Sequence, residues 1–284
     1  MFHFLSTKEW LNNRVAIITG ASSGIGKATA IALSRKGCHV VLCSRNLDKL
    51  QEIEKELSHL RNGVISIPVD ITDPESVAGL VTKTLEHFAR IDFLVCSAGE
   101  YLRCPAVKTS MTQIQHLLEV NFWGNLNCIY GVLPHMLKRG KGQIVIVSSM
   151  DAKKGIPPDA AYVASKAAIS GFADVLRQEL RAQGIKVTTI FPGRVNTPMI
   201  SQLAVPWISA KIPPEKVAKV IVKSLEKKKT EIIVPGLGPK FLVLVQTISP
   251  ALADWLVNFF KLGGKELPGN SINNSHITKK TVSN

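Results

Sequence analysis

The sequence predicts an α/β fold with a single, doubly wound parallel sheet of about seven strands. Short apolar runs alternate with helix-length segments from residue 14 to about 235. The runs lack polar alternation, as expected of strands buried on both faces. A glycine-rich turn also joins the first run to the first helix, as in Rossmann-type folds. We expect strands at residues 15–18, 39–43, 64–70, 92–96, 143–147, 185–191 and 231–234.

Helices are expected between these strands, on both faces of the sheet. The first follows the glycine turn and extends to about Lys36, where Gly37 ends it. Another begins at Pro74, a residue favoured in a first helical turn, with Asp73 before it as the cap. The remaining expected helices cover residues 47–60, two segments within 112–138, and 160–182.

Composition limits the possible functions. The chain has 284 residues, is 45% hydrophobic and 20% charged, and has a formal net charge of +14. Such a chain is globular, and its charge suits an anionic cofactor, a nucleic acid or an acidic membrane. The lysines are scattered apart from Lys227–Lys229, and there is no zinc-finger spacing, so we expect no nucleic-acid partner. The histidines have no metal-ligand spacing, so no metal site is expected.

The order of segments predicts one catalytic domain with short extensions. Residues 1–13 form an N-terminal extension with no long apolar stretch, and residues 14–235 form a dinucleotide-binding and catalytic domain. A helical extension is expected at 236–265, followed by a polar, disordered tail at 266–284. The five cysteines lack Cys-x-x-Cys spacing, which indicates reduced thiols and a cytoplasmic protein.

The turn Thr19–Gly26 has the strand–turn–helix setting of a phosphate-binding loop. Gly20 permits a tight turn, Gly24 leaves room for a pyrophosphate, and Gly26 allows the helix to pack closely on the strand. The helix N-terminus offers free N–H groups to phosphates. Two alternatives remain at this point: a plain Gly/Ser turn, or the Gly-x-Ser-x-Gly elbow of an α/β-hydrolase with Ser22 as nucleophile.

The ends of the next three strands carry residues suited to an adenine nucleotide. Ser44 and Arg45 end the second strand, where a guanidinium suits a 2′-phosphate, so NADP(H) is preferred over NAD(H). The alternative is a solvated surface arginine. Asp70, followed by Ile71, could accept a hydrogen bond from the adenine amino group, or could cap a helix. The small residues Ser97–Gly99 let a cofactor lie close to the backbone.

Four polar side chains are expected at the same sheet edge. Tyr162 and Lys166 lie four residues apart and therefore on one helix face. A cation beside the phenol should lower its pKa from about 10 toward neutrality. Ser149 ends the fifth strand and Asn121 begins the helical region after the fourth. Taken separately, Ser149 could be a polar residue at a strand end, Asn121 a helix cap and Lys166 a surface charge. Together with Tyr162 they indicate a catalytic site.

With these residues in place, the chain resembles a short-chain dehydrogenase/reductase over about residues 14 to 234. The matching residues are Thr19, Gly20, Gly24, Gly26, Asp70, Ala98, Gly99, Asn121, Ser149, Tyr162, Lys166, Pro192, Gly193, Val195 and Thr197. One departure is Cys96-Ser97-Ala98-Gly99, where many members of the family have Asn-Asn-Ala-Gly.

The resemblance implies a role for each catalytic residue. Tyr162 would be the general acid that protonates the substrate oxygen as hydride arrives. Lys166 would lower its pKa and bind the nicotinamide ribose, Ser149 would hold the carbonyl oxygen, and Asn121 would hold a water in a proton relay. The resemblance also makes Ser22 a phosphate-loop residue. The expected cofactor residues are Gly20, Ser22, Ser23, Gly24, Ile25, Gly26, Ser44, Arg45, Asp70, Ile71, Ser97, Ala98, Gly99, Tyr162, Lys166, Pro192, Gly193, Val195 and Thr197.

Residues 199–213 are expected to form a lid over a lipophilic substrate. Asp151 and Arg194 are the charges that could contact a polar substrate group. The expected pocket residues are Met150, Asp151, Ile156, Met199, Leu203 and Trp207.

The C-terminal extension reads as two short amphipathic helices, interrupted at Pro250 and Asp254. Lys240, Lys261 and Lys265 flank them, which suits contact with a membrane surface or a dimer interface. The alternative is a helix pair that closes the domain's own core.

We therefore expect an NADPH-dependent oxidoreductase acting on the carbonyl of a lipophilic substrate, such as a 3-keto lipid, a steroid-like ketone or a 3-oxoacyl thioester. The expected assembly is a homodimer or homotetramer, cytoplasmic and in peripheral contact with a membrane. The alternative is a catalytically silent protein on the same fold that senses NADP(H). The presence of Asn121, Ser149, Tyr162 and Lys166 argues against it.

Overall fold

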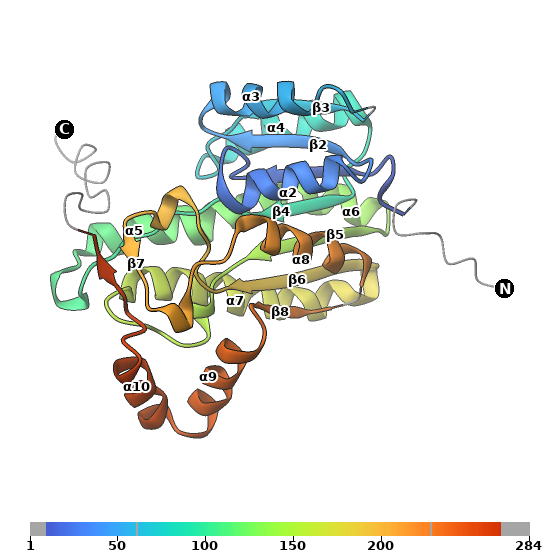
Figure 1. The fold of residues 1–284 in the computed structure, drawn as a ribbon. Coiled ribbons are helices and arrows are strands. Elements are labelled where there is room, and N and C mark those ends of the chain that lie inside the picture. Colours follow the sequence, from blue (N-terminus) through green and yellow to red (C-terminus); the bar gives the residue numbers. More distant parts are fainter. Residues whose placement is uncertain (1–9, 61, 228, 268–284) are drawn as a thin grey trace.

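A parallel sheet of seven strands forms the centre of the structure (Figure 1). The computed structural model describes residues 10–60, 62–227 and 229–267. The strand order is β3–β2–β1–β4–β5–β6–β8, and every adjacent pair is parallel, so the predicted fold class is confirmed. The strands are β1 (Val15–Thr19), β2 (His39–Ser44), β3 (Val64–Pro68), β4 (Phe93–Cys96), β5 (Gly142–Val147), β6 (Ile185–Pro192) and β8 (Glu231–Val234).

Helices cover both faces of this sheet. Alternate residues of β1 contact opposite layers: Ala16 and Ile18 pack with one apolar cluster, and Val15 and Ile17 with the other. This alternation follows from the period of two in a strand, and it explains why the buried strands are apolar throughout. The first cluster includes residues of α2 (Gly24–Ser34), α3 (Leu47–Leu57) and α8 (Pro214–Glu226), and the second includes residues of α4 (Pro74–Phe88), α6 (Gly124–Lys138) and α7 (Ala160–Leu180).

Most helix ends follow the local signals in the sequence. Asp73 accepts a hydrogen bond from the N–H of Glu75 and so caps α4, with Pro74 in its first turn. Gly37 has φ of +86° after α2, a conformation that disfavours residues with a side chain. The segment expected as two helices contains α5 (Met111–Leu118), a π-helical turn over Glu119–Trp123, and α6.

The strand order creates the crevice where ligands bind in such sheets. β1 lies between β2 and β4 in the sheet. The chain first adds β2 and β3 on one side of β1, and then crosses over to add β4 on the other side. The carboxyl ends of these strands therefore frame an opening at the topological switch point. The glycine turn that follows β1 lies in this opening.

The C-terminal extension is helical, as expected, and lies at one end of the domain (Figure 1). It consists of α9 (Leu237–Ile248) and α10 (Pro250–Phe259), with Pro250 at the start of the second helix. A short strand β9 (Lys265–Glu266) then pairs antiparallel with β7 (Leu203–Ala204), so residue 266 belongs to a strand. The rest of the tail predicted to be disordered, from 268 onward, and residues 1–9 of the predicted N-terminal extension lie outside the described residues.

In the described part of the chain, no helix is both long and apolar enough to cross a membrane.

Candidate functional site

The glycine turn after β1 forms a cradle for a phosphate group. Gly20 and Gly24 have φ values of +66° and +53°, which glycine adopts without strain. A Cβ added to Gly26 would lie 2.2 Å from the carbonyl oxygen of Gly20, so only glycine fits this close approach. Ser23 precedes α2 and makes no side-chain cap, which leaves the N–H groups of the helix available to an anion. The turn therefore fits the diphosphate of a dinucleotide.

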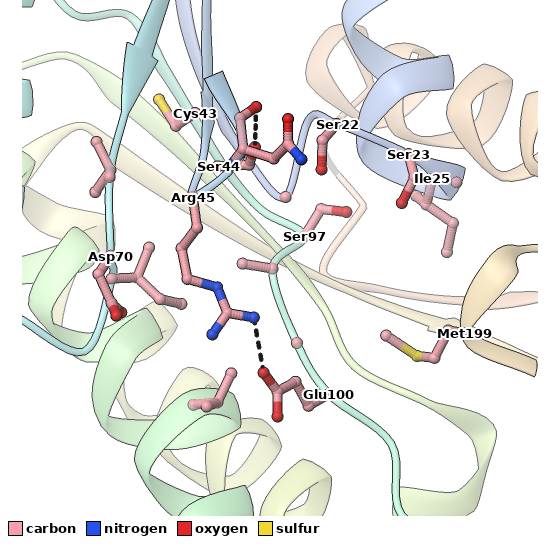
Figure 2. A pocket seen from close by; sticks show the side chains of 18 of the residues that line it. Ser22, Ser23, Ile25, Cys43, Ser44, Arg45, Asp70, Ser97, Glu100 and Met199 are labelled. Carbon is pink, nitrogen blue, oxygen red and sulfur yellow. Dashed lines mark hydrogen bonds and ion pairs between the residues drawn. The ribbon is translucent and has the colours of Figure 1, made fainter. Parts of the chain in front are cut away.

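A first cavity of about 350 Å³ adjoins this turn and follows the carboxyl ends of β1 to β4 (Figure 2). Its walls include most of the residues expected for the cofactor: Gly20, Ser22, Ser23, Gly24, Ile25, Ser44, Arg45, Asp70, Ile71, Ser97, Ala98, Gly99 and Thr197. Sequence reasoning did not assign the following wall residues to the cofactor: Cys43, Asn46, Val69, Thr72, Glu100, Val120 and Met199, the last of which was expected in the substrate pocket. The expected cofactor residues Gly26, Pro192, Gly193, Val195, Tyr162 and Lys166 do not line this first cavity.

Arg45 extends across the first cavity from the end of β2 (Figure 2). Its guanidinium donates a hydrogen bond to Glu100 Oε1 at 2.9 Å, and His116 contacts Glu100 Oε2 at 2.7 Å. The Arg45 side chain is 67% exposed, so the ion pair is well solvated and weak. The guanidinium can therefore change partner when an anionic ligand enters the cavity.

Asp70 organises the turn before α4. Its Oδ1 accepts hydrogen bonds from the N–H of Thr72 at 3.0 Å and from Thr72 Oγ1 at 2.7 Å. Figure 2 shows this carboxylate beside the cavity, below the end of β2. Of the two roles considered for Asp70, helix capping belongs to Asp73, whereas Asp70 holds the preceding turn.

Thr19 braces the loop after β4. Its hydroxyl oxygen accepts hydrogen bonds from the N–H groups of Ser97 and Ala98, both at 3.1 Å. A Cβ added to Gly20 would lie 2.8 Å from the Cα of Ala98, so the two loops pack closely. Thr19 thus connects the carboxyl ends of the neighbouring strands β1 and β4.

Asn121 is completely buried in the π-helical turn between α5 and α6. Its Oδ1 accepts from the N–H of Glu100 at 2.8 Å, and its Nδ2 donates to the Glu100 carbonyl and to Ser165 Oγ, both at 2.9 Å. A single π turn inside a helix is often associated with function, because it displaces the regular hydrogen bonds. The side chain joins the loop after β4 to α7.

Tyr162 and Lys166 lie on α7, one turn apart and both buried. Lys166 Nζ is 6.0 Å from the centre of the Tyr162 ring and donates to the Val147 carbonyl at 3.2 Å. A Cβ on Gly99 would lie 3.1 Å from the same Nζ, which places this amine beside the wall of the first cavity. Ser149 follows β5 and has its hydroxyl between the backbone and carboxylate of Asp151.

Burial has the largest effect on the acidity of Tyr162. It raises the phenol pKa above its usual value, and the carboxylates of Asp151 and Asp159 raise it further, while a hydrogen bond with Ser149 lowers it. Burial also lowers the pKa of Lys166 to about 8. The Tyr162 pKa is therefore raised and not lowered toward neutrality as expected, and desolvation of the phenolate is the largest cause.

A second cavity, also about 350 Å³, opens beside Tyr162 and Ser149. It adjoins the first, because Glu100 and Met199 line the first cavity while the next residues, Tyr101 and Ile200, line the second. Four of the six expected pocket residues line it: Met150, Asp151, Ile156 and Leu203.

The other two expected pocket residues lie elsewhere. Met199 faces the first cavity, and Trp207 is 87% exposed at the surface. Trp207 begins a single 3₁₀ turn, in which consecutive side chains point in different directions. The next residue, Ile208, lines the second cavity in its place.

The C-terminal helices supply much of the apolar wall. Phe241 and Leu242 of α9, Leu256 of α10, and the following Phe260 and Leu262 all line the second cavity. Their amphipathic pattern predicted the helices but gave no indication of what those helices cover. Periodicity identifies an apolar face and not its partner.

Comparisons with known proteins agree with this geometry. Residues 14–205 match the family model described as short chain dehydrogenase. The "Dehydrogenase/reductase SDR family member 7B" of Bos taurus is 32% identical over 279 residues, which cover 92% of this chain and 84% of that protein. The "11-beta-hydroxysteroid dehydrogenase-like 3" of Arabidopsis thaliana is 32% identical over 259 residues, covering 88% of this chain and 82% of that protein.

Solved structures show the same arrangement. An alcohol dehydrogenase from Thermococcus sibiricus complexed with 5-hydroxy-NADP superposes with a TM-score of 0.72 at 27% identity, covering 78% of this chain and 95% of that one. A variant of the actinorhodin polyketide ketoreductase with NADPH gives a TM-score of 0.71 at 26% identity and the same two coverages, 78% and 95%.

Proposed function

Because the chain belongs to the short-chain dehydrogenase family, whose members are NAD(P)-dependent oxidoreductases, we propose that it interconverts a carbonyl and a secondary alcohol on a lipophilic substrate with NADP(H). The observation that carries this proposal is the position of Tyr162 and Ser149 in a largely apolar cavity next to the cavity of the glycine turn. A 3-keto lipid, a steroid-like ketone or a 3-oxoacyl thioester would suit it.

The reaction would take place where the two cavities meet. Bound NADPH would supply the hydride. The phenol of Tyr162 would donate its proton to the substrate oxygen, and Ser149 would hold that oxygen by a hydrogen bond. Lys166 would bind the nicotinamide ribose, and Asn121 would position the proton relay. The raised pKa keeps Tyr162 protonated at neutral pH, as a general acid for reduction requires.

The preference for NADP(H) rests on Arg45. In the first cavity its exposed guanidinium is paired with the half-buried carboxylate of Glu100, and a 2′-phosphate could replace that partner with two charged oxygens. The solved relatives named above carry 5-hydroxy-NADP and NADPH, which is consistent with this choice.

The lipophilic substrate is supported by the side chains around Tyr162. The apolar wall is formed by Ile200, Leu203, Ile208, Phe241, Leu242, Leu256 and Phe260. The similarity to a protein named 11-beta-hydroxysteroid dehydrogenase-like 3 in Arabidopsis thaliana also supports an apolar, steroid-like ketone as the substrate of this chain.

Peripheral contact with a cytoplasmic membrane surface is supported by exposed apolar residues on α9 and α10. Leu237, Ile248, Trp255 and Phe259 are 89%, 76%, 55% and 62% exposed, respectively. Such a face, next to Lys240, Lys261 and Lys265, suits an interface with anionic lipid. Flotation with anionic vesicles, with and without residues 236–284, tests this; equal flotation would contradict it.

A homodimer or homotetramer is supported by exposed apolar side chains on the outer helices. Trp123, Tyr130 and Val175 are each more than half exposed on the layer of α6 and α7. Analytical ultracentrifugation tests this proposal, and a monomer at micromolar concentration would contradict it.

The experiment that tests the activity is a screen of NADPH oxidation against long-chain, steroid and short-chain ketones, with wild type and Tyr162→Phe. We expect turnover of at least one lipophilic ketone, and a loss of roughly 10²–10⁴-fold in Tyr162→Phe, the range for a general acid. NADPH affinity of the variant should be unchanged. If wild type binds NADPH but reduces no ketone, the sensing protein becomes the better account.

A further inference from the structure

We propose that Asp151 gives this enzyme a preference for carbonyl substrates that carry a hydrogen-bond donor, a hydroxyl or N–H group, on a carbon close to the reacting carbonyl. The inference rests on the proposed function, because it concerns the substrate of the same cavity. It arises from an inventory of the polar groups around the second cavity, most of which already have partners.

Four polar side chains of the second cavity are occupied by other parts of the protein. Tyr101 donates to Asp159 Oδ2 at 2.9 Å, and Lys154 pairs with Asp254 of α10. Arg194 donates to Ser209 Oγ at 3.0 Å and to the Leu262 carbonyl. Arg103 forms an ion pair with Asp159 Oδ1 at 3.5 Å, although this buried oxygen accepts no hydrogen bond from the described residues. Tyr101, Lys154 and Arg194 are therefore held by contacts within the protein, and Asp159 is held by Tyr101 and Arg103.

Asp151 differs from them because its partner is a catalytic hydroxyl. Ser149 Oγ donates to Asp151 Oδ2 at 3.2 Å and accepts from the N–H of Asp151 at 3.1 Å. Among the described residues, Ser149 is the one side chain recorded as donating to this carboxylate. Burial raises the pKa of Asp151, while the charge of Arg194 and the Ser149 hydrogen bond lower it. Asp151 lines the second cavity, and in either protonation state its carboxyl group has an oxygen that can accept a hydrogen bond.

A substrate carbonyl would compete with Asp151 for the hydroxyl of Ser149. Ser149 has one proton to donate, so a hydrogen bond to the substrate oxygen breaks the one to Asp151. The carboxylate would then lose its donor in an apolar cavity, which is unfavourable for a buried polar group. A ligand with no donor leaves that loss uncompensated, whereas a ligand with its own donor replaces the one that Ser149 withdraws.

The geometry limits where the substrate's donor must be. Ser149 Oγ and Asp151 Oδ2 are 3.2 Å apart. The substrate oxygen that accepts from Ser149 and the substrate group that donates to Asp151 must therefore lie close together. A carbonyl oxygen and a hydroxyl on the adjacent carbon, or on the next one, are separated by a similar distance. The predicted class is therefore an α- or β-hydroxy ketone, or an α- or β-amido ketone, with an apolar chain or ring.

Matched ketones test this preference. The substrates are 1-hydroxy-2-decanone, 1-methoxy-2-decanone and 2-decanone; the methoxy compound keeps the electron-withdrawing oxygen but has no donor. For wild type we expect kcat/KM of the hydroxy ketone to exceed that of the methoxy ketone by about tenfold or more, the value of a hydrogen bond to a charged group. Asp151→Ala should reduce this ratio to about one, and Asp151→Asn, which keeps a neutral acceptor, to a few-fold.

Asp159→Asn is the matched control, since it removes a second buried carboxylate of the same cavity, one that accepts a hydrogen bond from Tyr101 and pairs with Arg103 rather than with Ser149. It should keep the wild-type ratio, whatever its absolute rate. A wild-type ratio near one, or an unchanged ratio in both Asp151 variants, overturns the proposal while leaving the reductase activity intact.

If no ketone is reduced, the proposed function fails but the inference is still tested by binding. Calorimetry then compares the affinities of 1,2-decanediol and 1-methoxy-2-decanol for the protein saturated with NADP⁺. A preference for the diol that is lost in Asp151→Ala supports the proposal, and equal affinities contradict it.

Discussion

Tyr162 is buried against Tyr101, with their rings 4.9 Å apart and edge to face. Its raised pKa follows from this burial and from the two nearby carboxylates, Asp151 and Asp159. A protonated phenol is the form needed to reduce a carbonyl, and the raised pKa keeps Tyr162 in that form at neutral pH. Oxidation of an alcohol needs the phenolate and should therefore require more alkaline conditions.

Arg45 is the residue on which cofactor choice depends. Arg45→Ala should weaken NADPH binding about tenfold, which corresponds to the loss of one hydrogen bond to a charged group. The same variant should weaken NADH binding by less than about twofold. The affinities are measured by titrating the nicotinamide fluorescence. Lys55→Ala, which removes an exposed cation from the far end of α3, is the control and should change neither affinity. Equal weakening of both cofactors by Arg45→Ala would contradict the role of Arg45.

The residue types predicted much of the candidate site, but they did not predict the hydrogen bonds that the site residues make with one another and with other residues of the chain. Arg45, Ser149 and Asp151 could be assigned to the site from their positions at strand ends. Their contacts with Glu100 and with each other depend on side-chain directions, which sequence spacing does not specify. The same limit explains Trp207, where a short 3₁₀ turn rather than apolar character decides which side chain faces the cavity.

Among the elements, the turn between β1 and α2 has the strictest requirement for glycine. Gly26→Ala would place a Cβ 2.2 Å from the Gly20 carbonyl, so the strand and helix must separate. We expect a loss of about 2 kcal/mol in the free energy of unfolding, typical of overpacking, and a large loss of NADPH affinity. Urea unfolding and NADPH titration measure the two effects.

Gly79→Ala is the matched control for this element. Gly79 lies within α4, and a Cβ there would meet no atom within 4 Å. Alanine favours a helix over glycine, so this variant should be more stable by about 0.5–1 kcal/mol, with unchanged NADPH binding. Similar destabilisation by both variants would show that the tight contact at Gly26 is not the cause.

The helices and strands could be predicted more fully than the segments with which they pair or pack. The start of the helix at Pro74–Phe88 was predicted correctly, because Asp73 and Pro74 are strong local signals. The pairing of β9 with β7 was not predicted, since each strand has two residues and no distinctive pattern. The role of α9 and α10 as a cavity wall also depends on tertiary contacts that an amphipathic pattern does not encode.

Across the whole molecule, stability and catalysis are located at opposite edges of the sheet. Asp92 lies before β4 at the amino-terminal edge, only 4% exposed. It accepts hydrogen bonds from Arg14, Arg90 and Arg139, and from the N–H of Val15. Apart from Arg90, these partners are distant from Asp92 in the sequence, so the full cluster could not be predicted from local patterns.

The charge cluster predicts how stability changes with pH. Burial raises the pKa of Asp92, but hydrogen bonds from Arg90, the Val15 N–H and Arg139 lower it to about 2. The folded-state pKa of Asp92 thus lies below the ordinary value of 3.8, so the stabilisation of the fold by the Asp92 carboxylate is present above pH 4 and lost as pH falls through about 2. At about 1.36 kcal/mol per pKa unit, this amounts to about 2 kcal/mol.

Asp92→Asn should therefore lower the free energy of unfolding at pH 7 by at least about 2 kcal/mol, and the gap to wild type should narrow between pH 4 and pH 2. Urea unfolding at several pH values measures it. Asp174→Asn breaks the exposed pair with Arg177 and should cost about 0.5 kcal/mol or less. A gap for Asp92→Asn that stays constant down to pH 2 would contradict the cluster's role.

The central claim is that a carbonyl bound beside Tyr162 receives hydride from a nicotinamide held by the glycine turn. The most direct measurement is mass spectrometry of the alcohol formed from a lipophilic ketone and NADPH that carries deuterium at both C4 positions of the nicotinamide. The account predicts one deuterium on the carbinol carbon with wild type and almost no product with Tyr162→Phe. Product without deuterium, or equal labelled product from the variant, would contradict it.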